Sequence, residues 1–178
     1  MASFELSAFQ PTRDLSIVTA IESPASGIIQ LGFWLNDPMQ QIIWADKVAG
    51  HPRRDYLWEQ TCFELFIGIK DQDQYIEINL APSGAWQSYH FEEYRYPETT
   101  PPPINSKIEL VELKRTGFGL TATIDINLFL HHHKIAMKDL FIGISTVIES
   151  VTKTHYFAMQ HSSPEADFHN KRDWLHQF

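Results

Sequence analysis

The sequence has little cysteine, little positive charge and no long apolar run, and each shortage excludes a class of protein. The single cysteine, Cys62, cannot form an internal disulfide, so a chain of 178 residues depends on its hydrophobic core. The net charge of -8 opposes binding to nucleic acid phosphates. No segment approaches the ~18 apolar residues of a membrane span, and the N-terminus lacks the parts of a secretory signal. We therefore predict a cytoplasmic protein with neither nucleic acid nor membrane as a partner.

What the sequence does contain is a pattern typical of half-buried strands. Apolar residues recur mostly with period two, and the β-branched and aromatic runs end at Gly, Pro, Asn or Asp. Strands are expected at residues 4–9, 16–22, 28–35, 41–44, 62–70, 74–80, 85–91, 107–114, 119–126, 140–149 and 154–160. Helix signals are limited to single turns within residues 127–137 and at 163–165. The proline-rich segment 96–103 is expected to be an extended surface loop.

Strands this numerous, with so little helix, favour two packed antiparallel sheets. We predict one all-β domain over residues 1–178, an antiparallel β-sandwich of the immunoglobulin or jelly-roll kind, with one or two short helical turns.

Alternation assigns side chains to faces in the two consecutive strands predicted at 62–70 and 74–80. In each strand the bulky apolar residues fall on one side. This leaves Glu64, together with Cys62 and Phe66, on the other side of the first strand, and Glu77 and Asn79, together with Tyr75, on the other side of the second. If the two strands pair as a hairpin, these three polar side chains share one face.

Two interpretations of this polar face stay open. Acids on one side of an antiparallel sheet are most simply a solvent-exposed face. However, Trp58 lies just before the hairpin, and Trp86 and His90 follow it on a third strand. Aromatic rings beside acids and amides are what sugar binding requires, because the rings accept the apolar side of a pyranose while the polar groups bind its hydroxyls.

Three segments carry a resemblance to a known family. They are residues 55–67 (DYLWEQTCFELFI), 75–86 (YIEINLAPSGAW) and 164–169 (PEADFH). The first resembles the "LW…D…E.F" strand of DOMON-like domains related to family 9 carbohydrate-binding modules. The second is similar to that family's "E.N.sPsG.w" hairpin and the third to its "PDFH" loop. Segment 59–62 departs from the pattern, since it lacks the acidic residue that commonly precedes the Glu strand.

The resemblance implies a β-sandwich that binds sugars in some relatives and haem in other DOMON branches. Carried over by position, it nominates Trp58, Glu64, Asn79 and Trp86 for a ligand face, with Asp167 and His169 near its rim. With the two further residues from the strand faces, the predicted site consists of Trp58, Glu64, Glu77, Asn79, Trp86, His90, Asp167 and His169.

Other side-chain groups point less clearly to chemistry. The adjacent histidines 131–133 diverge from one another, which favours a solvated loop over a metal site. An axial haem pair is suggested only by Met159 with His161 or His90, and core packing explains Met159 better. Cys62 has no evident base beside it, so a thiol nucleophile is not expected.

We therefore predict a non-enzymatic domain that binds a carbohydrate or a similar small molecule and has no indicated cofactor. Two alternatives stay open: a haem-binding DOMON-like domain, and an interaction domain without a small ligand. Calcium held by loop carboxylates and the oligomeric state are not decided by the sequence.

Overall fold

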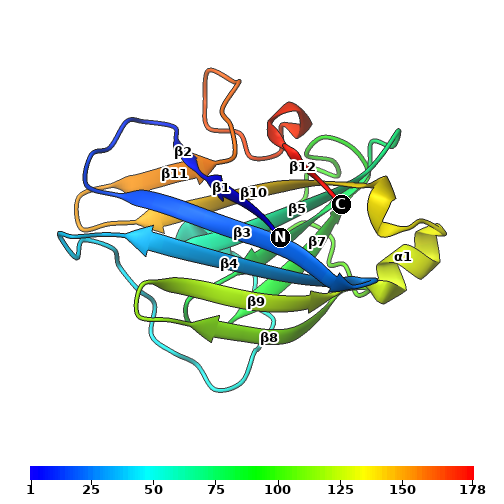
Figure 1. The fold of residues 1–178 in the computed structure, drawn as a ribbon, viewed down its shortest axis with the longest axis horizontal. Coiled ribbons are helices and arrows are strands. Elements are labelled where there is room, and N and C mark those ends of the chain that lie inside the picture. The colour runs from blue at the N-terminus through cyan, green and yellow to red at the C-terminus, as the bar shows by residue number, and fades with distance from the viewer.

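Two antiparallel sheets packed face to face make up the protein, as a computed structural model that describes residues 1–178 shows (Figure 1). The strands are β1 (Ala2–Glu5), β2 (Ser7–Ala8), β3 (Ser16–Ala25), β4 (Ile28–Asn36), β5 (Cys62–Ile69), β6 (Tyr75–Leu80), β7 (Trp86–Phe91), β8 (Glu109–Arg115), β9 (Gly119–Asp125), β10 (Leu140–Glu149), β11 (Thr154–Ala158) and β12 (His176–Gln177). The five-stranded sheet has the order β1-β3-β4-β9-β8, and the seven-stranded sheet the order β2-β11-β10-β5-β6-β7, with β12 also paired to β10. The predicted antiparallel β-sandwich is confirmed.

The main core lies between the two sheets and follows from the period-two pattern. Each strand turns its alternate apolar side chains inward, and 31 buried residues form one cluster there. Phe33 of β4 meets Phe63 of β5 across the sandwich, with ring centroids 4.8 Å apart. Burial of a ring of this size contributes a few kcal/mol, so these inward faces hold the sheets together.

The seven-stranded sheet is covered on its outer face as well. All eight residues of β5 are buried, which a strand facing solvent on one side would not show. A second cluster lies on this outer face and contains Phe66, Tyr75, Tyr89, Phe91 and Trp174. Its covering layer is made of the loops around residues 92–106 and 159–175. This layer creates the space for a site.

Helical structure is sparse, as predicted. The helical elements are α1 (Asn127–His133) and three 3-10 turns, η1 (Leu57–Glu59), η2 (Met137–Asp139) and η3 (Lys171–Asp173). Histidines 131–133, which we expected on a loop, form the last turn of α1. No helix is long and apolar enough to cross a membrane.

The turn expected at 163–165 is not helical. A 3-10 turn forms at η3 instead, where the Asn170 side chain accepts a hydrogen bond from the Arg172 backbone N–H at 3.2 Å. That cap satisfies an N–H which the helix start would leave free, and the segment at 163–165 has no equivalent.

Two strand predictions are wrong in detail. Residues 4–9 were expected to form one strand, but the chain changes sheets at the buried Leu6, so that β1 pairs with β3 while β2 pairs with β11. Residues 41–44 form only a single bridge, from Ile42 to Ser150. In both places apolar alternation reflects burial against the sandwich rather than a continuous ladder of hydrogen bonds.

Candidate functional site

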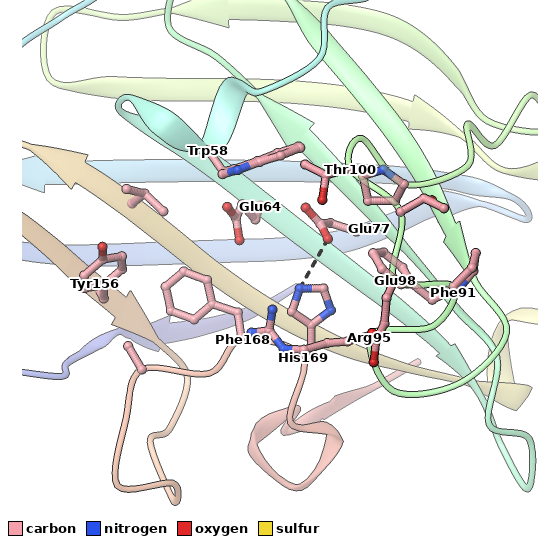
Figure 2. A pocket seen from close by; sticks show the side chains of 15 residues that line it. Trp58, Glu64, Glu77, Phe91, Arg95, Glu98, Thr100, Tyr156, Phe168 and His169 are labelled. Carbon is pink, nitrogen blue, oxygen red and sulfur yellow. Dashed lines mark ion pairs between the residues drawn. The ribbon is translucent and has the colours of Figure 1, made fainter.

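A pocket of about 470 Å³ opens on the outer face of the seven-stranded sheet (Figure 2). Its floor is formed by β5 and β6, and its walls by η1, β11 and the two covering loops. The charged and aromatic residues that line it are Trp58, Glu64, Glu77, Phe91, Arg95, Glu98, Tyr156, Phe168 and His169. Residues far apart in the sequence therefore meet over one sheet face.

Two buried carboxyl groups occupy the floor of this pocket. Glu64 on β5 is 3% exposed and Glu77 on β6 is 6% exposed. Glu64 lies directly opposite Asn79 in the antiparallel pair, which makes Glu64 and Glu77 diagonal neighbours on the same face. Ser145 Oγ donates to Glu64 Oε2 at 3.0 Å, and Asn79 Nδ2 donates to Glu77 Oε1 at 2.7 Å. The predicted grouping of Glu64, Glu77 and Asn79 on one face agrees with this register.

The carboxyl groups are held without a basic partner. Neither Glu64 nor Glu77 forms an ion pair with a lysine or arginine. Arg95 faces the same pocket, but its guanidinium binds Asp167 Oδ1 at 2.9 Å. Burial, followed by the charge of Glu77, raises the pKa of Glu64 well above its usual value, and burial raises the pKa of Glu77 to about 7. Both groups therefore favour a proton more strongly than ordinary carboxylates.

His169 approaches the pair from the covering loop. Its Nε2 lies 3.6 Å from Glu77 Oε2, and its Nδ1 lies 2.7 Å from the hydroxyl of Tyr75. That hydroxyl already accepts a hydrogen bond from the Arg95 backbone N–H at 3.1 Å, so its own proton is free to be donated to Nδ1. Burial, with a smaller effect of Arg95, lowers the pKa of His169 to about 3, so the ring is neutral. The tautomer assigned from these partners carries its proton on Nε2, toward Glu77.

Aromatic side chains frame the pocket above the acids. Trp58, in η1, meets Tyr89 edge to face with centroids 5.6 Å apart, and its indole N–H makes no hydrogen bond within the protein. Phe168 meets Tyr156 on the other side at 6.1 Å. Figure 2 shows Trp58 on one side of the two carboxyl groups and His169 on the other. The pocket thus combines a partly exposed aromatic face with hydrogen-bond acceptors.

The structure brings some of the predicted site residues together and separates others. Trp58, Glu64, Glu77 and His169 line the pocket. Asn79 is fully buried beneath it and binds Glu77, while Asp167 stands behind it as the partner of Arg95.

Trp86 and His90 are not in the pocket, contrary to the prediction. Trp86 lies opposite Leu80 and His90 opposite Ile76, so both project from the inner face of β7. Trp86 is buried in the core cluster, and the Arg53 guanidinium lies over its ring at 4.1 Å from the centroid. The outward positions of β7 belong to Gln87, Tyr89 and Phe91. The assignment to the ligand face was wrong because the turn before β7 sets which face its first residue takes.

Sequence reasoning missed several residues that line the pocket. Arg95, Glu98 and Thr100 come from the loop after β7, and Tyr156 from the outer face of β11. Phe168 lies within the loop segment 164–169, for which the resemblance nominates only the neighbours Asp167 and His169. Loop residues show no periodicity, so only the cluster of prolines marked their segment as distinctive.

The potential metal and haem ligands have defined positions in the fold. No group of three or more His, Cys, Asp or Glu side chains is arranged to hold a metal ion. Met159, the residue considered for haem, belongs to the core cluster between the sheets.

Comparison with known proteins bears on the fold. No family model matches the chain, and no curated protein matches it. The structure is similar to a crystal structure from Bacteroides uniformis, of a protein provisionally described as carbohydrate-binding, with a TM-score of 0.65. The match covers 97% of this chain and 84% of that one, at 11% sequence identity. At this identity the likeness shows a shared fold.

Proposed function

We propose that this protein is a non-catalytic binding domain whose outer-face pocket takes a carbohydrate. The observation that carries the proposal is the placement of Trp58 beside Glu64 and Glu77 in a pocket large enough for a small ligand. An aromatic face covers the C–H side of a pyranose, and carboxyl groups accept hydrogen bonds from its hydroxyls. The fold similarity to the Bacteroides uniformis protein and the resemblance of three sequence segments to DOMON-like domains support the same ligand class.

The polar groups in the pocket leave capacity for such a ligand. Glu64 accepts one hydrogen bond within the protein, from Ser145, and the indole N–H of Trp58 donates none. Buried polar groups normally form hydrogen bonds. Donors and acceptors that form none within the protein but line a pocket are therefore suited to a ligand rich in hydroxyl groups. His169, neutral and with its proton toward Glu77, adds a further polar edge.

A thermal-shift screen of the purified protein tests the proposal. The panel contains mono- and oligosaccharides, hemin, calcium and zinc. A ligand present at 100 times its Kd adds about 2.7 kcal/mol of stability, so a sugar should raise the melting temperature by several degrees. A rise with hemin alone would favour the haem-binding alternative, and a flat panel would favour an interaction domain without a small ligand.

Replacement of Trp58 tests the site itself. We expect Trp58→Ala to weaken binding of the sugar found in the screen by about tenfold, since a stacked aromatic contact contributes about 1 kcal/mol or slightly more. Isothermal titration calorimetry measures the change. Trp34→Ala is the matched control, because Trp34 is 40% exposed on the five-stranded sheet. Equal sugar affinity in the Trp58 and Trp34 variants would show that the sugar does not bind in this pocket.

A further inference from the structure

Acidic side chains outnumber basic ones in the lining of the pocket. Glu64, Glu77 and Glu98 are lining acids, whereas Arg95 is the one lining base, and it is bound to Asp167. His169 is neutral in its buried position. A neutral sugar would therefore bind beside two buried carboxyl groups that form no ion pair with a lysine or arginine, although the charge of the nearby Arg95 slightly offsets the rise of both pKa values. Buried charges are normally paired, because an isolated one loses its hydration without compensation.

We propose that the pocket selects a sugar bearing a protonated amine, so that the ammonium group lies between Glu64 and Glu77 and supplies the missing positive charge. This inference rests on the proposed carbohydrate function and names the ligand class within it. Glu64 and Glu77 are diagonal neighbours on paired strands, which corresponds to a Cα separation of roughly 7 to 8 Å. A compact cation placed between them can approach both carboxylates.

The aromatic wall supports the same ligand. Trp58 stands on one side of the carboxyl pair with part of its ring open to the pocket. Tryptophan is the ring that attracts cations most strongly, through the negative charge of its face. A neutral sugar would use the ring for stacking alone, whereas an amino sugar gains attraction from the ring and from both acids.

Ligand binding should also move a proton. The raised pKa of each acid means that the ligand-free pair holds a proton near neutral pH in place of a cation. An ammonium group that replaces this proton favours both ionised carboxylates, so a proton leaves the protein on binding. Affinity for the amine should therefore rise as pH increases from 5 to 7.

Other titratable groups face the pair from every neighbouring element. They are Cys62 of β5, Tyr75 of β6, Tyr89 of β7, Tyr156 of β11, Arg95 and Glu98 of one covering loop, and Asp167 and His169 of the other. Burial raises the pKa of Tyr89, so its hydroxyl stays neutral over this range. Burial raises the pKa values of Cys62 and Tyr75, which keeps both neutral over this range, and His169 stays neutral above about pH 4. The proton released between pH 5 and 7 is accordingly assigned to the carboxyl pair.

Calorimetric titration of the intact protein at pH 6 with glucosamine, glucose and N-acetylglucosamine tests the inference. N-acetylation removes the charge of the amine while keeping the ring. We expect glucosamine to bind at least about tenfold more tightly than the other two, as for a charge-assisted contact. Repeating the glucosamine titration in buffers with different ionisation enthalpies should show release of about one proton.

Two variants separate charge from shape. Glu64→Gln and Glu77→Gln keep side-chain size and the hydrogen bonds from Ser145 and Asn79, and each should reduce the preference for glucosamine by about tenfold. Glu112→Gln, an exposed change on β8 that also removes one negative charge, should keep the preference.

The outcomes distinguish this inference from the proposed function. If glucose binds as tightly as glucosamine, the charge inference is wrong while the carbohydrate function stands. Tight glucosamine binding without proton release also overturns it. If none of the three sugars binds, the amine selection is rejected and the proposed function is judged by the wider sugar panel.

Discussion

Trp86→Ala should lower the free energy of unfolding by about 3 to 5 kcal/mol and leave ligand affinity unchanged. Trp86 is 6% exposed within the core between the sheets, and removing a buried indole leaves a cavity that the neighbours only partly fill. The loss also removes the contact of its ring with Arg53. Urea unfolding measures the stability change, and calorimetry with the best sugar of the screen measures affinity.

Trp58→Ala serves as the reciprocal control for this prediction. Trp58 is partly exposed beside the pocket, so its loss should weaken binding with a much smaller change in stability. The opposite pattern, in which Trp86→Ala abolishes binding while the protein stays stable, would show that the ligand lies on the other face of β7.

The contribution of the buried carboxyl pair to stability should fall as pH rises from about 4.5 to about 7. His169, whose pKa is lowered to about 3 by burial, contributes in the opposite sense, so the prediction concerns the difference between the natural protein and a variant without the two carboxyl groups. A carboxyl group whose pKa is higher in the folded than in the unfolded state binds more protons when folded, and so favours folding at low pH. The pKa of Glu77 rises from 4.5 to about 7 on burial, and that of Glu64 rises well above 4.5. At 1.36 kcal/mol per pKa unit, the Glu77 shift alone corresponds to about 3 kcal/mol lost across the window from 4.5 to 7.

Thermal unfolding at closely spaced pH values measures this effect. Glu64→Gln and Glu77→Gln mimic the protonated form, and His169 is present in both proteins, so the melting temperature of the natural protein relative to the double variant should fall as pH rises from about 4.5 to about 7. Glu112→Gln, which changes an acid that is 48% exposed, should retain the pH dependence of the natural protein. A difference in melting temperature between the natural protein and the double variant that stays constant from about pH 4.5 to about pH 7 would contradict the buried carboxyl pair.

Most strands and the polar floor of the site followed from alternation, whereas Trp58 and His169 were nominated by the resemblance. In β5 and β6 every second residue from Phe63 to Ile69 and from Ile76 to Leu80 is a bulky apolar one, so the face shared by Glu64, Glu77 and Asn79 was predictable. In β7 alternation could not correct the placement that the resemblance gave to Trp86, because a period of two fixes relative faces only within a strand. The face on which Trp86 lies depends on its pairing with Leu80 across the turn, and this strand register could not be predicted from the sequence.

The resemblance to DOMON-like domains nominated Asp167 and His169 for the rim of the site, but the contacts that position the covering layer could not be predicted from the sequence. Arg95, Asp167 and His169 reach the site from loops that lack any repeating pattern, and only contacts between distant segments position them. The hydrogen bond of His169 with Tyr75 spans 94 residues of sequence, and the pairing of Arg95 with Asp167 spans 72. Such contacts depend on the finished fold, so composition and local spacing do not reveal them.

The N-terminal segment passes from one sheet to the other and so links the edges of the two sheets. Within seven residues the chain adds β1 to the border of the five-stranded sheet and β2 to the border of the seven-stranded sheet, with Leu6 buried between them. Detachment of this segment would expose the unpaired backbone of β3 and β11 at once. Exposed edge strands of that kind can pair with strands of other chains. The first eight residues therefore reduce the tendency of both sheets to associate with other copies of the protein.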